Sequence, residues 1–167
     1  MEQSKSYTYR LQGIDIVEKQ LFRTEPGPVT TYNFNVRTQS AIDEIRKLII
    51  VAIEVTVTKV DDTHTIAHFL VALGFEVIDF ENILPRDSNN LISVPIELEN
   101  ALKAISISTV RGIIFSELRG TVMHSAIMPI IQMGSLKPEK GDKIQDVRKP
   151  NVEKESKLSS KKDKIKK

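Results

Sequence analysis

The sequence predicts an α+β fold, in which a four-stranded antiparallel sheet carries a long helix packed on one face. Four segments with the alternating apolar residues of strands occupy the first half of the chain, and one segment with helical spacing follows them. Runs of strands followed by a helix are typical of α+β proteins. The chain has 167 residues, a length that suits one domain around one core.

The first strand is expected within residues 7–22. Apolar side chains alternate up to Leu11, and the alternation resumes in the opposite phase at Ile14. Gly13 lies at this change of phase, and a glycine there indicates a β-bulge. A second strand is expected at residues 31–38, followed by a polar loop from Thr38 to Asp43.

The third strand, at residues 45–60, shows the clearest pattern. Every second residue from Ile49 to Val57 is apolar and mostly β-branched, as strands prefer. Asp61 and Asp62 suit a hairpin turn into a fourth strand at residues 64–80. The run AHFLVAL within that segment also fits a buried helix, and the hairpin partner directly before it favours a strand.

An apolar loop is expected at residues 81–94, and a helix from about Ser93–Pro95 to Leu118. Proline suits a first helical turn, and the early glutamates complement the helix dipole. Gly112 is a weak point inside the helix, costing roughly 1 kcal/mol relative to alanine. Residues 119–136 are expected to be an irregular apolar segment, with a short helix as the alternative.

Charge divides the chain into an acidic body and a basic tail. Residues 137–167 hold 12 Lys and Arg against 6 Asp and Glu, whereas residues 1–136 hold 12 against 16. The tail is predicted to be disordered, so the domain ends at residue 136. An acidic body disfavours a nucleic-acid-binding fold. RNA contact through the lysine-rich tail remains an open alternative to a simple solubilising role.

The sequence offers little catalytic chemistry. It has no cysteine, and its N-terminus lacks the apolar core of a signal peptide, so a cytoplasmic protein without stable membrane insertion is expected. His64 and His68 would lie roughly 13 Å apart on one strand face, too far to share a metal ion. His124 and Ser125 lack the setting of a nucleophile and its base. We therefore expect no enzyme, no metal and no cofactor.

Residues 94–136, VPIELENALKAISISTVRGIIFSELRGTVMHSAIMPIIQMGSL, resemble the SecB family of bacterial export chaperones. The family's helix ends in a Ser-x-x-Arg-Gly pattern and is followed by an apolar segment with a proline. The hairpin IEVTVTKVDDTHTIAHFLVALGFEVIDF is similar to the family's central hairpin. The likeness covers about residues 7–136.

The resemblance implies a homotetramer, built as a dimer of dimers, that holds unfolded or precursor proteins in apolar grooves without ATP. A role in protein export is the first expectation. The alternatives are a SecB-like chaperone of a toxin–antitoxin system, with an antitoxin as partner, and an interaction module for one specific folded partner. The basic tail departs from the family's pattern, which puts delivery to the SecA motor in question.

The resemblance also implies a set of site residues. Glu54 and Glu76, on the polar phase of the hairpin, are the candidates for motor contact. Client binding is expected from apolar residues of the loop, the helix and the segment after it, with burial in the core or a subunit interface as the alternative for each. The predicted client-binding residues are Phe75, Phe80, Ile83, Leu84, Leu91, Ile92, Phe115, Met128, Ile130 and Ile131.

Overall fold

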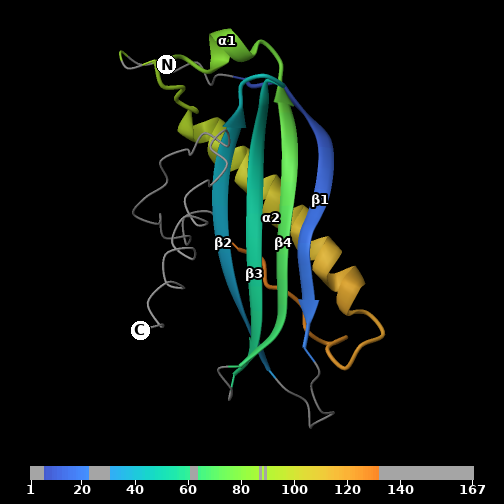
Figure 1. The fold of residues 1–167 in the computed structure, drawn as a ribbon. Coiled ribbons are helices and arrows are strands. Elements are labelled where there is room, and N and C mark those ends of the chain that lie inside the picture. The colour runs from blue at the N-terminus through green and yellow to red at the C-terminus, as the bar shows by residue number, and fades with distance from the viewer. Residues whose placement is uncertain (1–5, 23–30, 61–63, 87, 89, 132–167) are drawn as a thin grey trace, which may run out of the picture.

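Four long strands form one antiparallel sheet in the order β1-β4-β3-β2 (Figure 1). The structure is a computed structural model that describes residues 6–22, 31–60, 64–86, 88 and 90–131. The strands are β1 (Tyr9–Leu21), β2 (Tyr32–Asp43), β3 (Leu48–Lys59) and β4 (Thr65–Val77). The predicted fold class is confirmed. The predicted tail and the expected turn at Asp61 and Asp62 lie outside the described residues.

Three boundaries of the expected strands were wrong. The fourth strand ends at Val77 and not at residue 80, because Phe80 begins α1. Residues 38–43 continue β2 instead of forming a loop, because backbone pairing with β3 does not require apolar side chains: Thr38 lies opposite Ile53 and Ser40 opposite Val51. The third strand begins at Leu48, since residues 44–47 form the turn. In that turn the backbone N–H groups of Ile45 and Arg46 donate to Asp43 Oδ1 at 3.1 and 3.0 Å.

The helix α2 (Ile96–Leu118) lies on one face of the sheet and crosses it obliquely (Figure 1). It packs against β3 and β4, the two central strands. Its buried residues recur every three or four positions, as an amphipathic helix requires. The helix passes through Gly112 without a break, and Gly120 after its end has a φ of 81°. These buried residues are Leu98, Leu102, Ser106, Ile107, Val110, Ile114 and Leu118.

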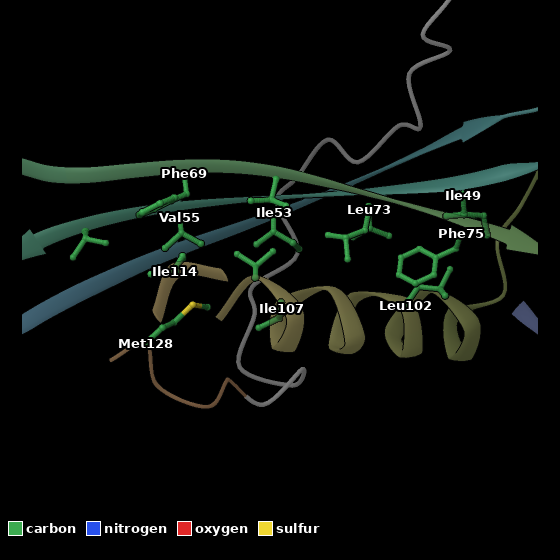
Figure 2. Packing of buried hydrophobic residues seen from close by; sticks show 14 of the residues in the cluster. Ile49, Ile53, Val55, Phe69, Leu73, Phe75, Leu102, Ile107, Ile114 and Met128 are labelled. Carbon is green, nitrogen blue, oxygen red and sulfur yellow. The ribbon is translucent and has the colours of Figure 1, made fainter. Parts of the chain in front are cut away.

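The core lies between α2 and the helix-facing side of the sheet (Figure 2). Ile53 and Val55 of β3 and Phe69 and Leu73 of β4 are fully buried there. The prediction that the segment of β4 is a strand and not a buried helix is thereby confirmed. Ser106 is the one buried polar residue of the described core, and its hydroxyl donates to the Leu102 carbonyl at 2.8 Å.

Two short segments close the ends of this core. Within the expected loop 81–94, α1 (Phe80–Ile83) forms a single turn that buries Phe80, and a β-bridge joins Arg86 to Ile92. After α2, residues 119–125 form turns and a bend and residues 126–131 have no regular secondary structure, with no helix in this described stretch. Met128 reaches back towards Ile114 and Val55 (Figure 2). No described helix is long and apolar enough to cross a bilayer.

Candidate functional site

Edge strand β1 presents a row of apolar side chains on the helix-facing side of the sheet. By register, Leu11 lies opposite Phe75, Ile14 opposite Leu73, Ile16 opposite Val71 and Leu21 opposite Ala67. The residues of β4 in these pairs are all buried. The four residues of β1 stay 39–45% exposed. We call Leu11, Ile14, Ile16 and Leu21 the β1 apolar row.

Two β-bulges keep this row on one side of the sheet. The register between β1 and β4 shifts between Leu11 and Gly13, as predicted, and again between Ile16 and Glu18. Each bulge adds one residue to β1 and reverses the phase of the alternation that follows. Without the first bulge, Leu11 and Ile14 would point to opposite faces. The second bulge was not predicted, although it returns Leu21 to the helix-facing side.

The row is exposed because α2 covers the central strands. The helix reaches β1 only where the C-terminal ends of the two elements meet. Lys19 Nζ of β1 forms an ion pair with Glu117 Oε2 of α2 at 2.7 Å. At the other end of the helix, the Ser40 hydroxyl of β2 lies 3.5 Å from Glu99 Oε1. The oblique path between these two contacts leaves much of the helix-facing side of β1 uncovered (Figure 1).

Further apolar side chains are exposed on α2 and on the segments at its ends. On α2, Ile105 and Phe115 are 37% and 49% exposed. In the loop before the helix, Leu91 is 64% exposed, and after the helix Ile127 and Ile130 are 64% and 81% exposed. Single exposed apolar residues are common on soluble proteins, whereas several on neighbouring elements indicate a surface that binds another protein.

The ten predicted client-binding residues divide by burial. Phe75, Phe80, Leu84 and Met128 are at most 4% exposed, so they belong to the core of this single chain and offer no surface in this structure. Phe75 illustrates the reason, since it lies between Ile49 and Leu102 (Figure 2). The other six are Ile83, Ile92 and Ile131, which are half-buried, and Leu91, Phe115 and Ile130, which are exposed.

The candidates for motor contact lie on the opposite side of the sheet, which we call the open face because α2 does not cover it. Glu54 Oε1 lies 3.1 Å from His68 Nε2, and its Oε2 lies 3.7 Å from Arg37 Nη1. Glu76 Oε2 forms an ion pair with Arg10 at 2.7 Å and accepts a hydrogen bond from Gln12. Hydrogen bonds from Arg10 and Gln12 lower the pKa of Glu76 below its usual value.

Two of the histidines, His68 and His124, lie beside carboxylates and a backbone carbonyl. His68 lies on the open face between Glu54 and Glu18, whose Oε1 is 3.6 Å from His68 Nδ1. His124 is exposed and its Nδ1 lies 3.2 Å from the Thr121 carbonyl. Among the described residues, no group of three or more His, Asp and Glu side chains could hold a metal ion. His68 and His124 therefore make surface contacts with carboxylates and with the backbone.

The β1 apolar row is the main part of the candidate site that sequence reasoning missed. Its residues were assigned to a strand, but their exposure depends on the path of α2, which the pattern of β1 does not contain. The sequence did contain one signal, the apolar character of β1 on both sides of the Gly13 phase change. An edge strand with exposed apolar side chains is a site at which another chain can pair.

Comparison with known proteins gives a structural likeness. A Mycobacterium tuberculosis SecB-like chaperone, solved in complex with a ChAD peptide from the HigA1 antitoxin, is similar to this chain with a TM-score of 0.50. The sequences are 12% identical, and the match covers 74% of this chain and 90% of that one. No family model and no curated protein matches this chain. The fold is therefore SecB-like, and the likeness concerns the fold alone.

Proposed function

We propose that this protein is a SecB-like chaperone that holds unfolded or precursor proteins without ATP. The observation that carries the proposal is the apolar surface on the helix-facing side: the β1 apolar row, Phe115 and the exposed residues of the segments around α2. A holdase needs apolar contacts that accept many chains and a surface that binds the unfolded state. The SecB-like fold agrees with this role.

Self-association is the second part of the proposal. An edge strand with exposed apolar side chains is a site at which another chain can pair. We expect copies of this protein to meet through β1 and assemble into a homotetramer as a dimer of dimers. Clients would then bind apolar residues that remain outside the subunit contacts, namely Leu91, Ile130 and their half-buried neighbours Ile92 and Ile131.

The test separates client binding from assembly. Leu91→Ser with Ile130→Ser removes two exposed apolar side chains from the proposed client surface, and the fold should persist because neither side chain is in the core. We expect weaker suppression of the aggregation of a denatured test protein, measured by light scattering without nucleotide, at unchanged oligomeric mass. Val60→Ser is the matched control, because Val60 is 49% exposed and directly follows β3, away from the proposed client surface.

The complementary variant addresses assembly. Ile14→Ser with Ile16→Ser should lower the oligomeric mass measured by multi-angle light scattering. A wild-type protein that stays monomeric and leaves the test protein to aggregate would refute the proposal. Equal activity of the Leu91/Ile130 variant and the Val60 control would place the client surface elsewhere.

A dedicated antitoxin chaperone is the second candidate, favoured by the antitoxin peptide bound to the similar solved structure. Such a protein would bind one antitoxin segment tightly and leave unrelated denatured proteins to aggregate. Titration of the protein with several unrelated clients and with the antitoxin encoded nearest to it distinguishes the two. An export role, a cytoplasmic location, and contact of Glu54 and Glu76 with the SecA motor remain predictions, as does the absence of enzymatic activity.

A further inference from the structure

The open face of the sheet carries a net negative charge. By register, five acidic and two basic side chains point to this face, a net charge of −3. They are Arg10, Asp15, Glu18, Arg37, Asp43, Glu54 and Glu76. The open face is therefore distinctly acidic, although the described chain as a whole is nearly neutral.

The other surfaces do not share this charge. On the helix-facing side, Lys19, Lys59 and the charged residues from Glu97 to Arg119 give five bases against three acids. At the end of the sheet near α1, three acids and three bases balance. Ion pairs join Arg86 to Glu44 at 2.8 Å and Lys47 to Glu81 at 3.6 Å, and Arg46 pairs with Asp43 of the open face at 3.7 Å. The negative charge is thus concentrated on one side of the molecule.

The centre of the open face is uncharged. Ile50 and Ala52 of β3 lie beside Gly74 and Ala72 of β4, and Gly13 of β1 continues the same row. These central residues of β3 and β4 are half-buried by their neighbours, and no described element covers them. A segment of chain lying across this surface would meet Ile50 and small residues, and no charged side chain, along this row.

We propose that the basic segment 137–167 of the same chain binds to the open face. Its 12 Lys and Arg against 6 Asp and Glu give it a net charge of +6, opposite to that of the face. Its aliphatic residues, among them Ile144, Val147 and Leu158, are spaced between lysines, which suits an uncharged centre with an acidic rim. This inference goes beyond chaperone function, because the proposed client surface lies on the other side of the sheet.

The connection is long enough for this contact. The described chain ends at Ile131 on the helix-facing side, and the 36 residues that follow could extend over roughly 120 Å at about 3.3 Å each. The sheet is only about 15 Å wide at about 4.8 Å between strands. Single exposed ion pairs are weak, but a tethered segment acts at an effective concentration in the millimolar range, so several weak pairs suffice.

The test uses carbodiimide crosslinking of the full-length protein, since this reagent joins a lysine amine to a carboxylate only where the two are in contact. At low salt we expect tail lysines joined to Asp15, Glu18 or Glu54 several-fold more often than to Glu97 or Glu99. At about 0.5 M NaCl, where the Debye length is about 4 Å, the crosslinks should fall sharply. Crosslinks spread evenly over both faces would overturn the proposal.

Matched charge reversals sharpen the result. Neither Asp15 nor Glu97 forms an ion pair or hydrogen bond within the described part of the chain, and the two lie on different faces. Asp15→Lys should reduce the crosslinks to Glu18 and Glu54 several-fold, whereas Glu97→Lys should not. Equal effects of the two variants would contradict a specific face, provided that thermal melts show both to be folded.

An isotope mixture distinguishes contact within one chain from contact between copies. Equal amounts of unlabelled and ¹⁵N-labelled protein should give crosslinks in which both peptides carry the same label. Mixed-label crosslinks at the statistical frequency would overturn the intramolecular contact. Aggregation suppression is measured on the same samples, so a loss of tail binding and a loss of chaperone activity are observed separately.

Discussion

At the scale of single residues, Glu76 joins the start of β1 to the end of β4. Its carboxylate accepts hydrogen bonds from Arg10 and Gln12, which stabilise the charged form and lower its pKa from the usual 4.5. A carboxyl group whose pKa is lower in the folded state stabilises the fold above its unfolded-state pKa. That contribution is lost as the pH falls through the folded-state pKa.

Glu76→Gln should therefore lower the melting temperature at neutral pH. The difference in melting temperature from the wild type should shrink progressively below pH 4.5. Thermal melts of both proteins between pH 7 and pH 3 measure this difference. Because the carboxylate is at the surface, added salt should reduce the difference as well. Arg10→Gln, which removes the partner, should show the same convergence at low pH. A constant difference across the whole pH range would show that the ion pair is not its cause.

At the scale of elements, α2 contains a glycine that the structure does not require. Gly112 lies on the exposed side of the helix, and a Cβ added there would meet nothing within 4 Å. Gly112→Ala should stabilise the fold by about 0.5–1 kcal/mol, because alanine loses less backbone entropy in a helix. Urea unfolding monitored by circular dichroism measures the change.

Gly120, just beyond the helix, is the matched comparison. Its φ of 81° is a conformation that residues with a Cβ avoid, although open space surrounds it. Gly120→Ala should therefore destabilise the fold by about 1–2 kcal/mol. Changes of the same sign at both glycines would contradict the proposed backbone cause. A lower oligomeric mass of Gly112→Ala would indicate close packing of another copy on this side of α2.

At the scale of the whole molecule, the helix-facing side of the sheet is only partly covered by its own chain. If copies cover the β1 apolar row of one another, folding is linked to association. The melting temperature should then rise with protein concentration, by mass action. Melts over a hundredfold range of concentration test this, and the Ile14→Ser/Ile16→Ser variant should lose the dependence. A wild-type melting temperature independent of concentration would argue for a folded monomer.

Much of the fold could be predicted because the spacing of apolar residues along each segment indicates its secondary structure. The alternation of β3 from Ile49 to Val57 and the helical spacing from Leu98 to Leu118 each identify an element and its buried face. Gly13, at the change of phase, correctly indicated the first bulge. The extension of β2 through Asp43 was missed because its polar residues are held by backbone pairing with β3, which leaves no trace in the pattern of β2.

The candidate site was only partly predictable. Leu91, Phe115 and Ile130 are exposed, whereas Phe75, Phe80, Leu84 and Met128 are equally apolar and lie in the core. Hydrophobicity alone does not distinguish the two groups, because exposure depends on what packs against each side chain. The sequence by itself determined which segments are strands and helix and which of their sides are apolar, since these follow from residue spacing and backbone preference. Only the tertiary structure decided which apolar side chains remain uncovered, because the oblique path of α2 leaves β1 in contact with water.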